Sequence, residues 1–203
     1  MAGLFITVEG IDGAGKTTHL EWLRRNFMSR GRSVVTTREP GGTPLGEAIR
    51  GLLLNSEYPI HAETEALLMF AARREHLDRV IRPALAAGQV VLCDRFTDAT
   101  FAYQGWGRGV GLAQLKILEE WVQHGLQPDP TLYFDVPVNI GRERIGRSQP
   151  LDRFEREQAD FFERVRAGYQ DRAMRDPQRV RVIDASRGMS DIQKEIEKIV
   201  SIY

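Results

Sequence analysis

Three closely spaced glycines precede a lysine and a threonine near the start of the chain, in the segment Gly10-Ile11-Asp12-Gly13-Ala14-Gly15-Lys16-Thr17. Glycines at this spacing let the backbone turn so that successive N–H groups point at one phosphate, and a helix that begins at the lysine adds its positive end. The lysine then reaches the outer phosphates of a nucleoside triphosphate, and the threonine hydroxyl contacts the Mg²⁺ ion that bridges them. We therefore predict a triphosphate site here, with Thr17 at the metal ion.

Two further polar segments follow apolar runs. Asp94 and Arg95 come directly after residues 90–93, and a carboxylate at such a strand end can hold Mg²⁺ or its waters. An ordinary solvated aspartate is the alternative. Arg38 opens the loop Arg38-Glu39-Pro40-Gly41-Gly42-Thr43, whose glycines permit close approach of a ligand, although a simple turn explains the same residues.

An aromatic residue and an arginine four positions apart could recognise a flat base. Phe70 and Arg74 lie on one face of a predicted helix, so a ring and a guanidinium would be presented together. The alternative is that Phe70 belongs to a core stripe with its apolar neighbours.

The overall composition excludes several classes of partner. The chain has 203 residues, and its 28 basic and 28 acidic side chains cancel, so no long-range field attracts nucleic acid or an anionic membrane. The single cysteine excludes an internal disulfide, and no apolar run reaches the roughly 18 residues of a membrane span. We expect a cytoplasmic protein with no nucleic-acid or membrane partner.

The elements that must position these residues alternate between short strands and longer helices. Strands are predicted at 4–8, 33–37, 89–93, 131–136 and 179–183, and helices at 16–30, 44–54, 62–87, 111–125, 138–147, 155–175 and 190–202. Such alternation predicts a three-layer α/β fold, with a five-stranded parallel sheet flanked by helices in a single domain over residues 1–203. Glu9, Arg38 and Asp94 would then share the carboxyl edge of the sheet, where ligands bind.

An arginine-rich segment at about 142–155 stands out from the rest of the chain. It carries the breakers Gly146 and Pro150 and has more basic than acidic residues. We predict a mobile LID there, which closes over a bound nucleotide.

Three motifs together resemble the bacterial thymidylate kinase family. They are residues 8–18, which include Thr18, residues 38–43, and Asp94-Arg95-Phe96-Thr97-Asp98-Ala99-Thr100-Phe101-Ala102-Tyr103-Gln104-Gly105. The resemblance covers nearly the whole chain. It implies a phosphate-loop nucleoside monophosphate kinase fold, a homodimer, and Mg²⁺-dependent transfer of the γ-phosphoryl group of ATP to dTMP, giving ADP and dTDP.

The resemblance also implies residue roles. ATP would be bound by Gly10, Ile11, Asp12, Gly13, Ala14, Gly15, Lys16, Thr17 and Thr18, and the metal ion by Thr17 and Asp94. The dTMP site would comprise Asp12 at the sugar, Arg38 and Arg95 at the phosphate, Phe70 and Arg74 at the base, Tyr103 at the 2′ position, and Thr100 and Gln104 as further base contacts. For Glu9, two roles remain open: orienting water or supporting Arg38.

Members of this family differ in where the catalytic arginine lies. The phosphate loop of this chain has no arginine, so the resemblance favours the type with catalytic arginines in the LID. Arg147 and Arg153 are expected to act there, together with Lys16 and Arg95. The chain departs from the usual pattern at Ala99, where many relatives carry serine, and at Trp106, where glycine is frequent.

The acceptor needs little activation in this reading, because a phosphate monoester is largely a dianion near neutral pH. Two rival interpretations are a kinase with another acceptor, such as a nucleoside hydroxyl that would need a general base, and a nucleotide-triggered switch with no acceptor. The absence of an Asn-Lys-x-Asp tetrad argues against the switch.

Overall fold

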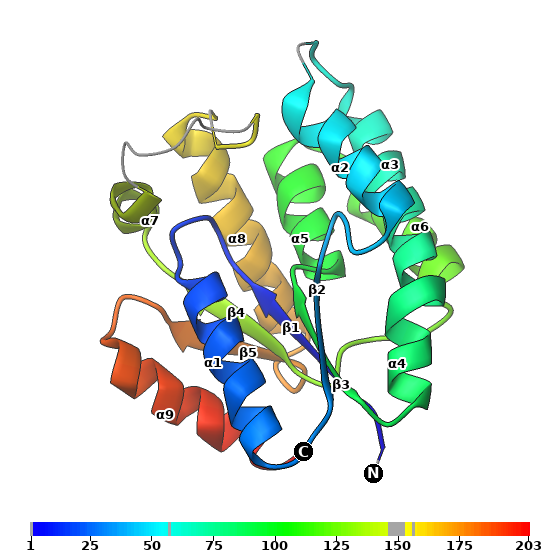
Figure 1. Ribbon diagram of the computed structural model, residues 1–203. Helices are drawn as coiled ribbons and strands as arrows, with labels where there is room; N and C mark the ends of the chain where they lie inside the picture. The colour runs from blue at the N-terminus through cyan, green and yellow to red at the C-terminus, as the bar shows by residue number, and fades with distance from the viewer. Residues whose placement is uncertain (1, 57, 146–152, 156) are drawn as a thin grey trace.

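In the computed structural model, which describes residues 2–56, 58–145, 153–155 and 157–203, five parallel strands form one sheet (Figure 1). The strands are β1 (Leu4–Glu9), β2 (Val34–Arg38), β3 (Val90–Asp94), β4 (Thr131–Asp135) and β5 (Val180–Asp184), in the order β2-β3-β1-β4-β5. Val8 of β1 lies opposite Asp94 of β3, and Arg38 of β2 also lies opposite Asp94. The register therefore brings the polar ends of these strands to one edge, as predicted.

Helices cover both faces of the sheet. They are α1 (Lys16–Ser29), α2 (Pro44–Asn55), α3 (Ala62–His76), α4 (Arg82–Ala86), α5 (Thr97–Thr100), α6 (Leu112–Gln123), α7 (Val138–Ile145), α8 (Ala159–Arg175) and α9 (Met189–Val200), with the π-helical segments η1 (Leu77–Ile81) and η2 (Phe101–Gly107). In Figure 1, α1 and α9 lie in front of the sheet, and α8 and α5 lie behind it. The three-layer α/β class is confirmed.

In the central strand β1, successive apolar side chains pack into two different clusters. Leu4, Ile6 and Val8 pack into a cluster that includes side chains of α1, α8 and α9, whereas Phe5 packs into a second cluster built on α3, η1 and η2. Successive side chains of a strand point to opposite faces, so a nearly continuous apolar run is needed when both faces are covered. The central strand β1 is buried throughout for this reason.

Helix ends also follow the local sequence. The Thr43 hydroxyl accepts a hydrogen bond of 3.0 Å from the Gly46 N–H, and Pro44 occupies the first helical position of α2. The predicted helix 62–87 is observed as α3, η1 and α4 in succession, with Pro83 in the first turn of α4. A proline is tolerated in the first turn of a helix, because an N–H at that position has no partner within the helix. The helical path therefore continues through Pro83.

The helical segment over residues 97–107 was not predicted. Its glycines and aromatic residues are poor helix formers, but it packs along α8. A Cβ atom on Gly107 would lie 2.7 Å from a ring carbon of Phe161 in α8, and one on Gly168 would lie 2.9 Å from Ala102 Cα. Close packing of small residues, which is a tertiary effect, therefore outweighs the weak local propensity.

No helix in the described part of the chain is both long and apolar enough to span a bilayer.

Candidate active site

The glycine-rich loop joins the end of β1 to the start of α1. Gly10, Gly13 and Gly15 all have positive φ angles, which the turn requires and other residues rarely adopt. The Lys16 ammonium donates to the Ile11 carbonyl oxygen at 2.9 Å and lies 3.6 Å from Asp12 Oδ1. Burial and the nearby Arg95 guanidinium lower the pKa of Lys16. The Lys16 ammonium is thus held over the loop, where it can contact a bound phosphate.

The loop also touches the helix that leads into the expected LID. A Cβ atom on Gly13 would overlap the Gly141 carbonyl oxygen of α7, and one on Gly141 would lie 2.9 Å from the Asp12 carbonyl oxygen. The two backbones therefore meet without intervening side chains. Only glycine fits at this contact.

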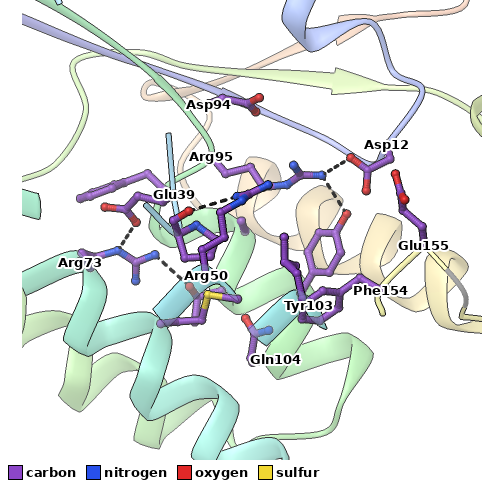
Figure 2. A pocket seen from close by; sticks show the side chains of 16 residues that line it. Asp12, Glu39, Arg50, Arg73, Asp94, Arg95, Tyr103, Gln104, Phe154 and Glu155 are labelled. Carbon is purple, nitrogen blue, oxygen red and sulfur yellow. Dashed lines mark hydrogen bonds and ion pairs between the residues drawn. The ribbon is translucent and has the colours of Figure 1, made fainter. Parts of the chain in front are cut away.

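A cavity of about 240 Å³ opens beside the loop, at the carboxyl ends of β2 and β3 (Figure 2). Its walls come from the phosphate loop, from α2 and α3, from α5 and η2, and from Phe154 and Glu155. The lining residues are Asp12, Glu39, Pro40, Arg50, Leu54, Met69, Arg73, Asp94, Arg95, Phe96, Ala99, Thr100, Tyr103, Gln104, Phe154 and Glu155. This cavity can hold a second, acceptor molecule next to a nucleotide on the loop, and we call it the acceptor cavity.

Arg95 connects the acceptor cavity to the phosphate loop. Its Nη2 donates to Asp12 Oδ1 at 2.7 Å, to the Tyr103 hydroxyl at 3.2 Å and to the Gly10 carbonyl at 3.4 Å. Its backbone has a φ of 66°, uncommon for a residue with a side chain. Burial alone would raise the pKa of the Asp12 carboxyl, but Arg95 and Lys16 hold it well below its usual range. A charged guanidinium is therefore fixed between the two sites.

Arg73 is a site residue that the sequence reasoning missed. Its guanidinium donates to Glu39 Oε2 at 2.8 Å and to the Thr100 hydroxyl at 3.0 Å, and Glu39 also contacts His76 Nδ1 at 2.9 Å. The remaining nitrogen, Nη1, is buried and has no hydrogen-bond partner among the described residues. A buried N–H without a partner is costly, and Arg73 lines the cavity, so Nη1 is available to donate to a ligand bound there.

Phe70 and Arg74, the residues predicted to contact the base, lie outside the acceptor cavity. Phe70 is 2% exposed in the core, and Arg74 donates to the Val122 carbonyl at 3.1 Å and pairs with Asp78 at 2.8 Å. Adjacent helical positions differ by about 100° in direction. Met69 and Arg73, one residue earlier, are the pair four apart that lines the cavity.

Three other expected acceptor residues do line the cavity. Thr100, Tyr103 and Gln104 are all buried in its wall, and Thr100 holds Arg73 as described. Gln104 Nε2 donates to Glu65 Oε1 at 2.7 Å. Tyr103 shares its hydroxyl with Arg95, so it lies at the loop end of the cavity.

Arg38 lies beside the cavity rather than in its wall. Its guanidinium pairs with Glu47 at 2.9 Å, and Glu47 also accepts a 3.0 Å hydrogen bond from the Gly42 N–H. These contacts, the hydrogen bond from Arg38 foremost, lower the pKa of Glu47. Arg38 and Asp94 instead share a neighbouring hollow.

Glu9 contacts the Phe96 N–H and the Tyr169 hydroxyl rather than Arg38, and it does not line the cavity. Oε1 accepts a 2.7 Å hydrogen bond from the Phe96 N–H, and Oε2 contacts the Tyr169 hydroxyl at 2.9 Å. Burial, with a smaller contribution from Asp98, raises its pKa to about 8. Glu9 therefore holds the backbone directly after Arg95.

Asp94 and Thr17 have the properties that a Mg²⁺ site would need. Asp94 Oδ1 is buried and lacks a hydrogen-bond partner within the described residues, as the isolated carboxylate in Figure 2 illustrates. Thr17 is exposed at the start of α1. The described residues contain no group of three or more His, Cys, Asp or Glu side chains suited to a metal ion. Mg²⁺ is often bound by one or two protein ligands with phosphates and waters, so a threonine hydroxyl and an unpaired carboxylate oxygen are suitable ligands for this ion.

A second hollow lies on the other side of the loop. It is lined by Ala14, Gly15, Thr18, His19, Arg144, Ala185, Arg187, Met189 and Ile192. Arg144 of α7 donates to the Ala185 carbonyl at 2.9 Å, and the His19 ring stacks on Phe134 at 5.2 Å. This hollow borders the phosphate loop through Ala14, Gly15 and Thr18.

The expected LID is described only in part. Arg147 lies outside the described residues. Arg153 forms an ion pair with Glu65 and donates to the Leu53 carbonyl at 2.8 Å, away from the phosphate loop. These contacts hold the Arg153 guanidinium on α2 and α3, so the expected catalytic role of Arg153 stays a prediction.

A parallel sheet with a phosphate loop, and an acceptor cavity beside it, define a phosphate-loop nucleoside monophosphate kinase. A family model described as thymidylate kinase matches residues 8–196. The chain is 60% identical to the thymidylate kinase of Nitrosospira multiformis, covering 100% of both chains, and 61% identical to that of Nitrosomonas europaea, covering 99% of this chain and 94% of that one. The crystal structure of thymidylate kinase from Ehrlichia chaffeensis superposes with a TM-score of 0.77 at 35% identity, over 98% of this chain and 99% of that one. The chain belongs to the thymidylate kinase family.

Proposed function

We propose that this chain transfers the γ-phosphoryl group of ATP to dTMP, giving ADP and dTDP. The observation that carries the proposal is the acceptor cavity, which has a fixed guanidinium at each end: Arg95 beside the loop and Arg73 on the opposite side (Figure 2). A nucleoside monophosphate has a phosphate at one end and a base with carbonyl oxygens at the other. The full-length similarity to thymidylate kinases supports dTMP as that nucleotide.

The base of dTMP would lie at the Arg73 end. Arg73 Nη1 would donate to a thymine carbonyl, and Glu39 and Thr100 keep the guanidinium oriented for that hydrogen bond. Met69 and Phe96 supply apolar walls for the ring, and Gln104 lies at its edge.

The sugar and phosphate of dTMP would lie at the Arg95 end. Tyr103 would occupy the space of a 2′-hydroxyl, and Asp12 would lie near the 3′-hydroxyl while it holds Arg95. Arg95 would bind the acceptor phosphate, and Arg38 would join it by leaving Glu47.

ATP would bind on residues 10–18 with its adenine in the hollow beside Arg144 and Arg187. We propose that Thr17 and Asp94 hold Mg²⁺ or its waters, and that the bound ion supplies positive charge that offsets the repulsion between phosphates. Lys16 would turn from the Ile11 carbonyl to the outer phosphates.

Catalysis would rest on position and charge rather than on a general base. The second pKa of a phosphate monoester is about 6, so the acceptor is already a nucleophile near neutral pH. The charge of the loose transition state would be stabilised by Lys16, by Arg95 and by Arg147 of the LID. Phe154 and Glu155 help enclose the cavity, which limits access of water to the γ-phosphate.

We further propose that the chain acts in the cytoplasm as a single-domain kinase and forms a homodimer through the groove between α3 and α6. The groove is lined by Leu67, Phe70, Ala71, Arg74, Leu118, Trp121, Val122 and His124. Trp121 is 72% exposed at its edge, with Leu67 and Ile117 also exposed nearby. A projecting tryptophan and an apolar hollow on one face match the self-complementary contact of a two-fold dimer.

A coupled assay of ADP release, with dTMP, dUMP, dCMP, dGMP and thymidine as separate acceptors, tests the function. We expect turnover with dTMP to exceed turnover with dCMP and dGMP by at least about tenfold, because one missing hydrogen bond to a charged group costs about 1.5–3 kcal/mol. Equal turnover without any acceptor would favour a nucleotide-triggered switch instead.

A further inference from the structure

One buried acid of α3 is not explained by contact with a substrate. Glu65 has no solvent exposure, yet it does not line the acceptor cavity. An ionised carboxylate in the interior is costly unless it is paired and hydrogen-bonded. Its partners therefore indicate what it does.

The partners of Glu65 are Gln104 of η2, Arg108 directly after η2, and Arg153. Oε1 accepts a hydrogen bond of 2.7 Å from Gln104 Nε2 and lies 3.8 Å from Arg108 Nε, while Oε2 forms the ion pair with Arg153. Gln104 is itself a wall residue of the acceptor cavity. Glu65 thus lies directly behind that wall.

The two arginines connect Glu65 to the residues on either side of position 156. Arg153 is further fixed by its backbone N–H, which donates to the Leu54 carbonyl at 3.3 Å, and by its Nε, which donates to the Leu53 carbonyl. Arg108 pairs with Glu157 at 2.7 Å. Through these two cations, one carboxylate of α3 holds residues 153–155 and residue 157 against α2, α3 and η2.

The segment held in this way forms part of the acceptor cavity. The Phe154 ring lies edge-on to Tyr103, with centroids 5.9 Å apart, and the guanidinium groups of Arg153 and Arg108 lie 4.6 Å and 5.6 Å from its centroid. Phe154 and Glu155 both line the cavity.

We infer that Glu65 is a positioning residue of the acceptor site, which acts through Arg153 to hold Phe154 and Glu155 as a wall around the bound nucleotide. The inference rests on the proposed function for the identity of that nucleotide. It assigns Arg153 to acceptor binding, because the guanidinium is engaged by Glu65 and Leu53 at the outer side of the cavity. A catalytic role for Arg153 would instead predict that its replacement lowers kcat and leaves dTMP binding unchanged.

The test compares Glu65→Gln, Arg153→Gln and the double variant, with dTMP and ATP varied separately. Each single variant should raise the KM for dTMP about tenfold and change kcat and the KM for ATP by less than about threefold, because the lost contact positions only the acceptor wall. The double variant should be no worse than the more impaired single variant, since both changes remove the same ion pair. Arg153→Lys should recover part of the loss.

Glu63→Gln is the matched control, because Glu63 is exposed on the same turn of α3. It should leave both KM values unchanged. Binding of dTMP, measured by titration calorimetry on the same proteins, should weaken by the same factor as the KM rises. Should Glu65→Gln fail to fold, the comparison of Arg153→Gln with Arg153→Lys carries the test.

Two outcomes would overturn the inference. One is an additive loss in the double variant. The other is a fall in kcat for Arg153→Gln with unchanged dTMP binding and a silent Glu65→Gln, which would assign Arg153 to the transferred phosphoryl group. A wild-type protein that does not phosphorylate dTMP would refute the proposed function, and the calorimetric comparison would still decide the role of Glu65.

Discussion

The Arg95 guanidinium is bound to the Asp12 carboxylate at 2.7 Å, so a cation that lines the acceptor cavity is linked directly to the phosphate loop. Asp12 lies on the loop and Arg95 directly after β3, and the parallel pairing of β1 with β3 places both at one edge of the sheet. Under the proposed function, this ion pair would keep a positive charge between donor and acceptor, which would limit the reorganisation needed during transfer.

Arg95→Ala should lower kcat by about 10³-fold, because a positioned arginine in phosphoryl transfer contributes about 10³ to 10⁵ in rate. Arg38→Ala should mainly raise the KM for dTMP, since Arg38 pairs with Glu47 and lies outside the cavity wall. Steady-state kinetics at saturating ATP distinguish the two. Similar losses of kcat in both variants would contradict the separate roles.

Arg73→Lys should raise the KM for dTMP about 10- to 100-fold, because a hydrogen bond to a charged group contributes about 1.5–3 kcal/mol. Lysine cannot reproduce the planar guanidinium that would bind Glu39, Thr100 and a base together. The same substitution at the next position, Arg74→Lys, is the control and should leave the KM within about twofold. If Arg74→Lys were the more damaging change, the base would lie on the other face of α3.

Glu9→Gln should reduce the pH dependence of stability. The pKa of Glu9 is raised from 4.5 to about 8 in the folded protein, so its contribution is fully present below the unfolded value and is lost as the pH rises through the folded value. Glutamine stays neutral and can keep both hydrogen bonds. The stability of the variant relative to wild type should therefore grow between about pH 5 and about pH 8, by up to about 1.4 kcal/mol per pH unit.

Chemical denaturation of both proteins at several pH values measures this difference. Parallel stability curves for the two proteins would mean that Glu9 is ionised in the folded state near neutral pH.

Trp121→Glu should convert the proposed dimer to monomers, because it places a charge in the apolar groove between α3 and α6. Light scattering after gel filtration should show the mass falling from twice 23.0 kDa to 23.0 kDa. Met174→Glu, at an exposed position of α8, is the control and should leave the mass unchanged. A wild-type protein that elutes as a monomer would refute the dimer.

The sheet and most of the helices could be predicted from the sequence, because buried parallel strands and amphipathic helices leave clear periodic patterns. Each predicted strand overlaps an observed one, with the ends displaced by about one residue. The helical segment 97–107 could not be predicted in this way, since it depends on close packing of Gly107 and Gly168 between η2 and α8.

Arg73, which we propose binds the base, shows why the site was harder to predict than the fold. Arg73 and Arg74 are the same residue type in succession, so composition and spacing cannot distinguish them. What distinguishes them is the pairing of Arg73 with Glu39, a contact between residues that are far apart in the chain. The ion pair of Arg153 with Glu65 is hidden from the sequence for the same reason, because Glu65 lies on α3.

The direct backbone contact between Gly13 and Gly141 has a consequence for how this sequence can diverge. Neither position can accept a side chain unless α7 moves away from the phosphate loop, and such a shift would also move Arg144, which borders the hollow proposed for adenine. A side chain at either glycine would therefore require the same shift of α7, although the two residues lie far apart in the chain. Covariation at this pair would report the distance between loop and helix in related enzymes.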